Sequence, residues 1–335
     1  MPNTPVWKHL GLAVCVLALA LFIFVMTPAG SKAAPGDEIA RIVAKGEIVD
    51  LTVTVSEDYP AHWPYHPPFK RWIMNWFKKQ AGPYTRNPRT GVGGPGDTIQ
   101  EDLVQSVFPY YSQQYIIDDH TGTQVDYPAH FIPPPGANMP FESEMGWMTG
   151  DKYPLENQMG PAVVIDLRSI RDKADIAKSP LITVDMIKAD ERKNGAIKKG
   201  DVVIFYSGYD DAYYKPFPEG NRLAWDPIVA GTTPAWPAPT PEAVIYLAEK
   251  GVRHIAIDSP SMGPWGFEWE DRPMAQMTHV SFLKYGGSWT EFCRNLGKLP
   301  ARGAYFISLS AKIVDASGGL TRAIAIKPRG RGIGE

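Results

Sequence analysis

Short apolar runs bounded by turn residues recur along the chain and predict buried strands. Residues 48–55 are rich in β-branched side chains and predict an opening strand. Further buried strands are predicted over residues 162–167, 200–206 and 254–258, where valine and isoleucine dominate. His254 lies between apolar neighbours in the last of these strands, so we expect it to have a structural role.

Helical patterns occupy the segments between these strands. Residues 184–193 predict a helix, and a second follows Thr240, which is a favourable N-cap residue. Pro241 suits the first helical position of that helix, and Gly251 suits its end. Such alternation of helices and strands is typical of an α/β fold.

Three further helices are predicted with fewer characteristic residues at their ends. We expect helices over residues 69–79, 274–285 and 288–296. Asp210 and Asp211 follow a strand end, a position typical of a solvated turn.

The first residues resemble a targeting segment. Lys8 precedes an apolar run over residues 10–26, and the small residues Ser31 and Ala33 suit signal-peptidase cleavage. Residues 1–34 are therefore predicted to be a signal peptide, or an anchor if they are not cleaved. Either alternative predicts an exported protein, periplasmic or secreted, that is held at the membrane only if the segment remains. Cleavage also leaves Cys293 as the sole cysteine, so no internal disulfide is expected.

The remaining chain is long enough for one large domain, predicted over residues 45–330. Its formal net charge of −2 does not favour a nucleic-acid partner. Residues 57–115 are rich in proline, glycine and aromatic residues and resemble an insertion. We expect this insertion to act either as a lid over a pocket or as an interface arm.

One short segment gathers groups that bind divalent metals. If the segment is extended, Gln124, Asp126 and His130 lie on one face, because side chains alternate along a strand. The glycine-containing turn before it brings His120 into the same region. Imidazole, carboxylate and amide groups together favour a metal site, although a polar loop rim has the same composition.

A second pair of polar residues lies further along the chain. His279 falls within the helix predicted over residues 274–285. Ser288 and Glu291 have the spacing of a helix capping box, so Glu291 has an ordinary structural explanation.

Residues 120–130 resemble the His-x-Gly-Thr-His-x-Asp-x-Pro-x-His signature of the cyclase family, which includes bacterial kynurenine formamidases. The resemblance covers most of residues 48–326 and continues in chain order. It includes Asp50-Leu-Thr, the strand over 200–206, the segment Gly251–Asp258, the pair His279 and Glu291, and the closing segment 310–326.

This resemblance implies a swivelling β/β/α domain with a mixed sheet and flanking helices, often assembled as a dimer or tetramer. It implies that His120, Asp126, His279 and Glu291 bind one or two divalent ions, with Asp126 and Glu291 shared in dinuclear members. It also implies that His130 transfers protons and that Trp63 contacts a small-molecule substrate.

The chain departs from the signature at Gln124, where the family has a second histidine. An amide oxygen is a harder ligand than imidazole, so we expect weaker zinc binding, a single ion or a shift toward manganese. The implied activity is metal-dependent hydrolysis of a C–N amide bond in an aryl formamide or cyclic amide. The alternatives are a lactone hydrolase of the dienelactone type and an inactive exported protein that binds a small molecule.

Overall fold

The computed structural model describes residues 35–76 and 111–335, which belong to two units, 1–45 and 46–335. The described part of the first unit is helix α2 (Pro35–Lys45). No helix within the described ranges has the length and apolar character needed to cross a membrane. The predicted signal peptide, residues 1–34, lies outside the described residues.

The second unit is built on a mixed sheet of nine strands. Their order is β1-β15-β13-β5-β7-β9-β12-β4-β14. The four central strands β5, β7, β9 and β12 run parallel, and the remaining neighbours pair antiparallel. The strands are β1 (Glu47–Asp50), β4 (Gln124–Asp126), β5 (Met159–Asp166), β7 (Val202–Tyr206), β9 (His254–Ile257), β12 (Ser288–Glu291), β13 (Ala304–Ile307), β14 (Gly318–Leu320) and β15 (Ile324–Lys327).

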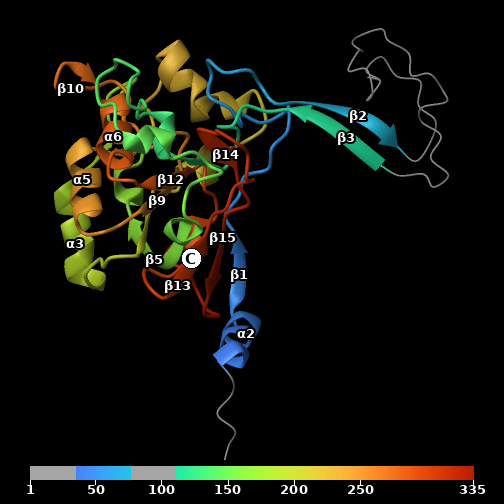
Figure 1. The fold of residues 1–335 in the computed structure, drawn as a ribbon, viewed down its shortest axis with the longest axis vertical. Helices are drawn as coiled ribbons and strands as arrows, with labels where there is room; N and C mark the ends of the chain where they lie inside the picture. The colour runs from blue at the N-terminus through green and yellow to red at the C-terminus, as the bar shows by residue number, and fades with distance from the viewer. Residues whose placement is uncertain (1–34, 77–110) are drawn as a thin grey trace, which may run out of the picture. The chain divides into compact units, whose positions relative to one another are not determined.

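Three helices flank this sheet on one side (Figure 1): α3 (Val184–Asn194), α5 (Pro241–Glu249) and α6 (Met274–Leu283). As predicted, Thr240 caps α5, and its hydroxyl accepts a hydrogen bond from the backbone N–H of Ala243 at 3.3 Å. The predicted α/β class, with a mixed sheet and flanking helices, is confirmed.

The central strands are buried on both faces, which explains their continuous apolar sequences. In β7, Val203 and Phe205 pack in the core beneath the helices. Val202 and Ile204 alternate with them and belong to a second core, which includes residues of β1, β13 and β15.

Smaller elements complete the unit. Helix α4 (Tyr209–Tyr213) follows β7, and a 3-10 helix (Pro128–His130) follows β4. Three two-stranded sheets pair β2 (Lys70–Trp76) with β3 (Tyr111–Ile116), β6 (Leu181–Ile182) with β8 (Ala238–Pro239), and β10 (Glu268–Trp269) with β11 (Arg272–Pro273).

Three local predictions are wrong. The sequence predicts a helix over residues 69–79, but Lys70–Trp76 forms a strand that pairs with β3, and residues 77–79 lie outside the described residues. Residues 288–296 also do not form a helix, because Ser288–Glu291 is strand β12, inserted between β9 and β4. Its Trp289 and Thr290 favour a strand, and the capping-box interpretation of Glu291 is therefore excluded. Asp210 is not a solvated turn residue, because its side chain is fully buried.

His254 has the structural role predicted for it. Its Nδ1 contacts Oγ of Ser288 at 2.8 Å, and its Nε2 contacts Oγ1 of Thr290 at 2.8 Å. These alternate residues of β12 lie on one face of the strand, so Trp289 and Glu291 face the other way. His254 thereby provides hydrogen-bond partners for the buried hydroxyls of Ser288 and Thr290, on the face of β12 opposite to Glu291.

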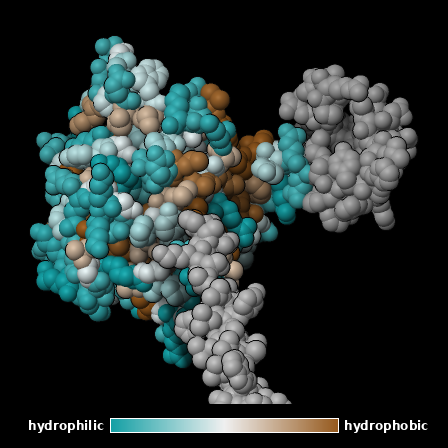
Figure 2. Space-filling model, turned by 60° about the horizontal axis from the view of Figure 1, so that its bottom comes forward, coloured by the Kyte–Doolittle hydropathy of each residue, from teal (hydrophilic) through white to brown (hydrophobic). Residues whose placement is uncertain are grey.

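Hydrophobic residues also lie on the surface. Figure 2 shows mostly hydrophilic residues on the visible face of the described body, with hydrophobic patches between them. Ile48 and Tyr305 are exposed, and both are register partners of Ile326, so they share one face of the sheet. Exposed apolar residues are common in monomers. The expected dimer or tetramer therefore stays a prediction.

Candidate metal centre

Strands β4 and β12 carry the centre's main polar residues. Gln124 and Asp126 are two positions apart on β4, so their side chains lie on the same face. Glu291 is the antiparallel register partner of Gln124, and Trp289 is the partner of Asp126. Sheet register therefore brings residues that are far apart in the sequence onto one polar surface.

His130 and His120 reach this surface from segments that flank β4. The expectation that His130 lies on the extended strand is wrong, because Pro128 begins a 3-10 helix that ends at His130. His120 precedes Gly122, which adopts a φ of +64°. A Cβ at Gly122 would lie 2.7 Å from Cγ2 of Val55, so this tight turn requires glycine.

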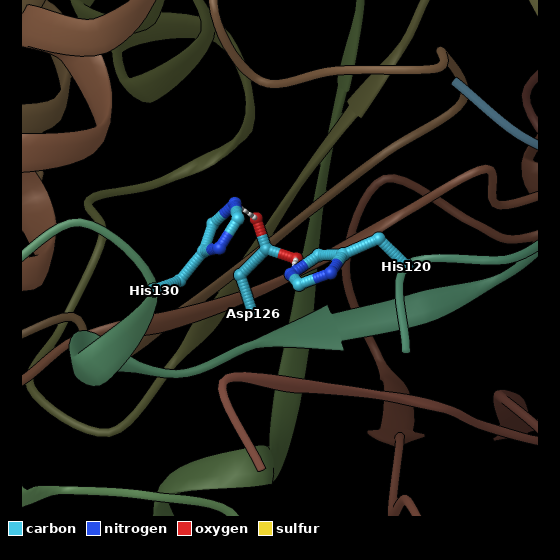
Figure 3. A group of neighbouring side chains, drawn as sticks. All are labelled: His120, Asp126 and His130. Carbon is cyan, nitrogen blue, oxygen red and sulfur yellow. Dashed lines mark ion pairs between the residues drawn. The ribbon is translucent and has the colours of Figure 1, made fainter. Parts of the chain in front are cut away.

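Asp126 lies at the centre of the cluster, with histidine side chains around its carboxylate. His120 Nε2 is 3.5 Å from Asp126 Oδ1, and His130 Nε2 is 3.9 Å from Oδ2. Figure 3 shows these two imidazoles pointing to the two oxygens of Asp126. His279, from α6, places its Nε2 3.8 Å from Asp126 Oδ2 and 3.8 Å from Glu291 Oε1.

Hydrogen bonds select the tautomers of two of these rings. His279 Nδ1 lies 2.7 Å from the backbone oxygen of Ala275, which can only accept, so Nδ1 donates. His120 Nδ1 lies 2.8 Å from Oδ1 of the carboxylate of Asp119 and donates to it. Each ring therefore presents its Nε2 to Asp126, which is the arrangement that outer carboxylates and carbonyls impose on metal-binding histidines.

Three acceptor atoms in the cluster are buried without a hydrogen-bond partner: His120 Nε2, Gln124 Oε1 and Asp126 Oδ1. Desolvated acceptors of this kind cost about 1–3 kcal/mol each when nothing binds them. A divalent cation fits this set, because it accepts electron pairs from nitrogen and oxygen together. Three-residue groups with ligand atoms within 4.8 Å of one another include His120, Asp126 and His130, and also Asp126, His279 and Glu291.

The metal-free cluster has strongly shifted pKa values. Burial raises the pKa of Asp126, and burial followed by the charge of Asp126 raises the pKa of Glu291 well above its usual value. Burial lowers the pKa of His279 to about 4. Burial also opposes the charging of His120, but Asp126 and the carboxylates before it raise its pKa to about 11. Without a metal, the cluster therefore favours a protonated His120 beside Asp126, and Nε2 becomes an acceptor for a cation only when that proton leaves.

A cavity of about 430 Å³ adjoins these residues. Much of its wall is aromatic, formed by Trp63, Tyr65, Phe131, Trp265 and Phe292. Trp63, which was predicted to contact substrate, packs edge-on against Trp236 and Trp265, with ring centroids 5.7 and 6.2 Å away. The structure brings all seven predicted site residues to this cavity: Trp63, His120, Gln124, Asp126, His130, His279 and Glu291.

Two supporting residues were not predicted from the sequence. Asp119 orients His120, and Trp289 donates from Nε1 to Asp126 Oδ2 at 2.7 Å. Asp119 directly precedes His120 of the signature, and its position beside a motif residue is only a weak sequence signal for a role in orienting that histidine. Trp289 became identifiable only once Ser288–Glu291 was known to be a strand, because alternation then places Trp289 and Glu291 on the same face.

The chain is similar in sequence to known hydrolases. The isatin hydrolase of Roseibium aggregatum is 28% identical over 238 residues, covering 66% of this chain and 77% of that protein. A kynurenine formamidase of Erythrobacter litoralis is 27% identical over 206 residues, covering 61% and 72%.

Solved structures show the same fold. Isatin hydrolase A from Ralstonia solanacearum matches with a TM-score of 0.64 and 24% identity, over 89% of this chain and 99% of that one. Isatin hydrolase A from Labrenzia aggregata, bound to benzyl benzoate, matches with a TM-score of 0.63 and 20% identity, over 88% and 100%. The family model described as putative cyclase matches residues 49–264. This chain therefore belongs to the cyclase family.

Proposed function

We propose that this protein is a metal-dependent hydrolase that cleaves the C–N bond of an aromatic amide, either an aryl formamide or a cyclic amide. The observation that carries the proposal is the set of three unpartnered buried acceptors around Asp126, beside an aromatic cavity. The similarity to an isatin hydrolase and a kynurenine formamidase supports amide hydrolysis.

The proposed ion, zinc or manganese, would be held by the residues around Asp126. His120, Gln124 and Asp126 supply the unpartnered acceptors, and His279 and Glu291 lie close enough to contribute. A bound divalent cation polarises a carbonyl group and lowers the pKa of water near it.

We assign proton transfer to His130. Burial, followed by the neighbouring His120 and His279, lowers its pKa well below 6.5, so the ring is neutral at pH 7. A neutral imidazole accepts a proton from the attacking water as the new C–O bond forms. The same ring then returns that proton to the leaving nitrogen as the C–N bond breaks, which yields a carboxylic acid and an amine.

The cavity wall favours an uncharged aromatic substrate. The residues described along it include neither lysine nor arginine, so no side chain of these two kinds lies there to pair with a substrate carboxylate. Its uncharged polar groups include the side chains of Ser261 and Gln276. We therefore place a neutral cyclic amide ahead of an amino-acid formamide such as N-formylkynurenine.

A side-by-side substrate assay tests this proposal. The protein without residues 1–34, loaded with Mn²⁺ or Zn²⁺, is assayed with isatin, N-formylkynurenine and a dienelactone. We expect the highest kcat/KM with isatin and no turnover after Asp126→Ala. A higher kcat/KM with the lactone would support the lactone-hydrolase alternative. Stoichiometric metal binding without turnover of any of these compounds would favour the inactive binding protein.

Export and assembly remain part of the proposal. A fusion of residues 1–34 to a reporter that is active only outside the cytoplasm tests the predicted signal. Light scattering during gel filtration measures whether the mature protein is a dimer or tetramer.

A further inference from the structure

A tight turn over residues 63–66 brings a further histidine to the cavity. The backbone N–H of His66 donates to the oxygen of Trp63 at 2.9 Å, and Pro64 occupies the second position, which proline favours in such turns. Trp63 anchors the turn, because its ring packs edge-on against Trp236 and Trp265. His66 is thereby held at the cavity wall, and the residues proposed to hold the ion do not include it.

The two nitrogens of the His66 ring have different surroundings. Nδ1 is buried and lies 3.3 Å from Oδ1 of Asp118, whereas 40% of the side chain is exposed. The exposed edge of the ring is therefore the opposite one, which carries Nε2. The contact with Asp118 lacks the geometry of a full hydrogen bond. The negative charge of the carboxylate nevertheless favours a proton on the nearer nitrogen, Nδ1, because a lone pair there would be repelled.

Asp118 is itself held in place beside the metal centre. Its Oδ1 accepts from the backbone N–H of His120 at 2.9 Å, and its own backbone N–H donates to Oγ1 of Thr121 at 3.1 Å. The same Oδ1 lies 3.6 Å from Nδ1 of His120. One carboxylate oxygen therefore contacts both His66 and His120, which places His66 next to the centre.

This arrangement makes His66 an acceptor for a substrate donor. A neutral imidazole with its proton on Nδ1 has a lone pair at Nε2. Such a nitrogen accepts a hydrogen bond from an N–H group, and it repels the lone pairs of the ring oxygen of a lactone. In an amide the N–H group is bonded to the carbonyl carbon, so its acceptor must lie beside the centre that polarises the carbonyl. The position of His66 at the cavity wall, next to His120, meets this requirement.

We infer that His66 Nε2 accepts a hydrogen bond from the N–H of the substrate amide, and that His66 thereby determines a preference for secondary amides over lactones. This inference rests on the proposed function and names the substrate group that the site recognises. It gives His66 a role in binding and leaves proton transfer with His130. Lactones and tertiary amides lack this hydrogen, so the inference predicts that they are poorer substrates.

The test compares isatin with benzofuran-2,3-dione, in which a ring oxygen replaces the N–H. The two compounds have nearly the same size, and comparing each variant with the unmodified, metal-loaded protein cancels the difference in their intrinsic reactivity. His66→Phe keeps a planar ring but removes the acceptor. We expect it to lower kcat/KM about tenfold for isatin and less than about twofold for the dione. An equal change for both compounds, or no change for isatin, would overturn the inference.

Three further variants sharpen the assignment. His66→Gln keeps an oxygen that can accept the N–H, so it should retain part of the preference for isatin. His62→Phe is the matched control, because His62 is a histidine of the same segment and is not among the described residues that line the cavity. It should leave the ratio of the two kcat/KM values unchanged. Gln276 is another polar residue of the wall. A selective loss for isatin in Gln276→Leu, without one in His66→Phe, would assign the N–H to Gln276 and overturn the inference.

A binding measurement separates this inference from the proposed function. Metal-loaded His130→Ala is titrated with isatin and with N-methylisatin, and binding is followed by calorimetry. We expect isatin to bind about tenfold more tightly, and His66→Phe in the same background to remove the difference.

Failure of the inference and failure of the proposed function give different results. This binding preference, without hydrolysis of isatin by the unmodified protein, would retain the inference and overturn the proposed function. Hydrolysis of isatin, with equal binding of the two compounds, would retain the proposed function and overturn the inference. Failure of both compounds to bind would overturn both.

Discussion

Trp289 Nε1 donates a hydrogen bond to Oδ2 of Asp126 at 2.7 Å, across the antiparallel pair β12–β4. The carboxylate of Asp126 is almost completely buried, with 1% of the residue exposed, so this bond fixes its rotation. The other oxygen, Oδ1, therefore faces Nε2 of His120. An indole on one strand thus determines which oxygen the neighbouring strand presents to the centre.

Replacing Trp289 by phenylalanine tests whether this hydrogen bond orients the carboxylate of Asp126. The aromatic ring can still stack on Phe282, whose ring centroid lies 5.8 Å away, but the donor to Asp126 is lost. We expect Mn²⁺ affinity to fall about 10–100-fold, as is usual when an outer-shell partner of a ligand is removed. Titration of the chelator-stripped protein measures this. The exposed Trp147 provides the control substitution Trp147→Phe, and equal affinities in the two variants would contradict the prediction.

Asp119 should control the orientation of His120. It accepts from His120 Nδ1 through Oδ1, and its Oδ2 accepts from Ser317 Oγ at 2.8 Å. Asp119→Asn removes the charge that orients the ring, so we expect about a 10-fold or greater loss of Mn²⁺ affinity. Ser317→Ala is the matched control, because it removes a donor to Asp119 and leaves the contact with His120. A larger loss in Ser317→Ala than in Asp119→Asn would show that His120 is not oriented in this way.

His130 should be needed for turnover and not for retention of the ion. His130→Ala is expected to lower kcat by about 10²–10⁴-fold, because the group that accepts and returns the proton is lost. Metal content should stay unchanged, whereas Asp126→Ala should lose the metal. Elemental analysis beside steady-state kinetics distinguishes the two roles. If His130→Ala lost its metal, His130 would have to be counted as a ligand.

Asp210 should make stability depend on pH. Its carboxylate is buried and neither oxygen has a hydrogen-bond partner. Burial, followed by the charges of Asp258 and Asp211, raises its pKa well above 3.8. The folded state therefore retains a proton that the unfolded chain releases. Stability supplied by this proton is complete below pH 3.8 and is lost as pH rises through the folded pKa.

Asp210→Asn removes this dependence, because an amide does not ionise. We expect the variant to be more stable than the unmodified protein at pH 8, with a smaller difference at pH 5. Urea denaturation at both pH values gives the two free energies of unfolding. Asp271→Asn, at an exposed position, should show no such divergence. Parallel pH profiles for Asp210→Asn and the unmodified protein would contradict the prediction.

Local sequence patterns were sufficient where short-range interactions decide the structure. The helix after Thr240 was predicted because its cap, its first proline and its terminal glycine are all local signals. The strand over Val202–Tyr206 was predicted because burial on both faces demands a continuous apolar run. Residue type and spacing likewise identified His120, Gln124, Asp126 and His130 as a polar group near one strand.

Pairing between distant segments decided the rest. Ser288–Glu291 has the local pattern of a helix start, but pairing with β9 and β4 makes it a strand, because the tertiary contacts outweigh a weak local preference. That register places Glu291 opposite Gln124 and Trp289 opposite Asp126. The sequence by itself therefore determined which chemical groups are available, since these depend on residue type. Only the tertiary structure decided which acceptors remain unpartnered, since that depends on donors brought from segments far along the chain.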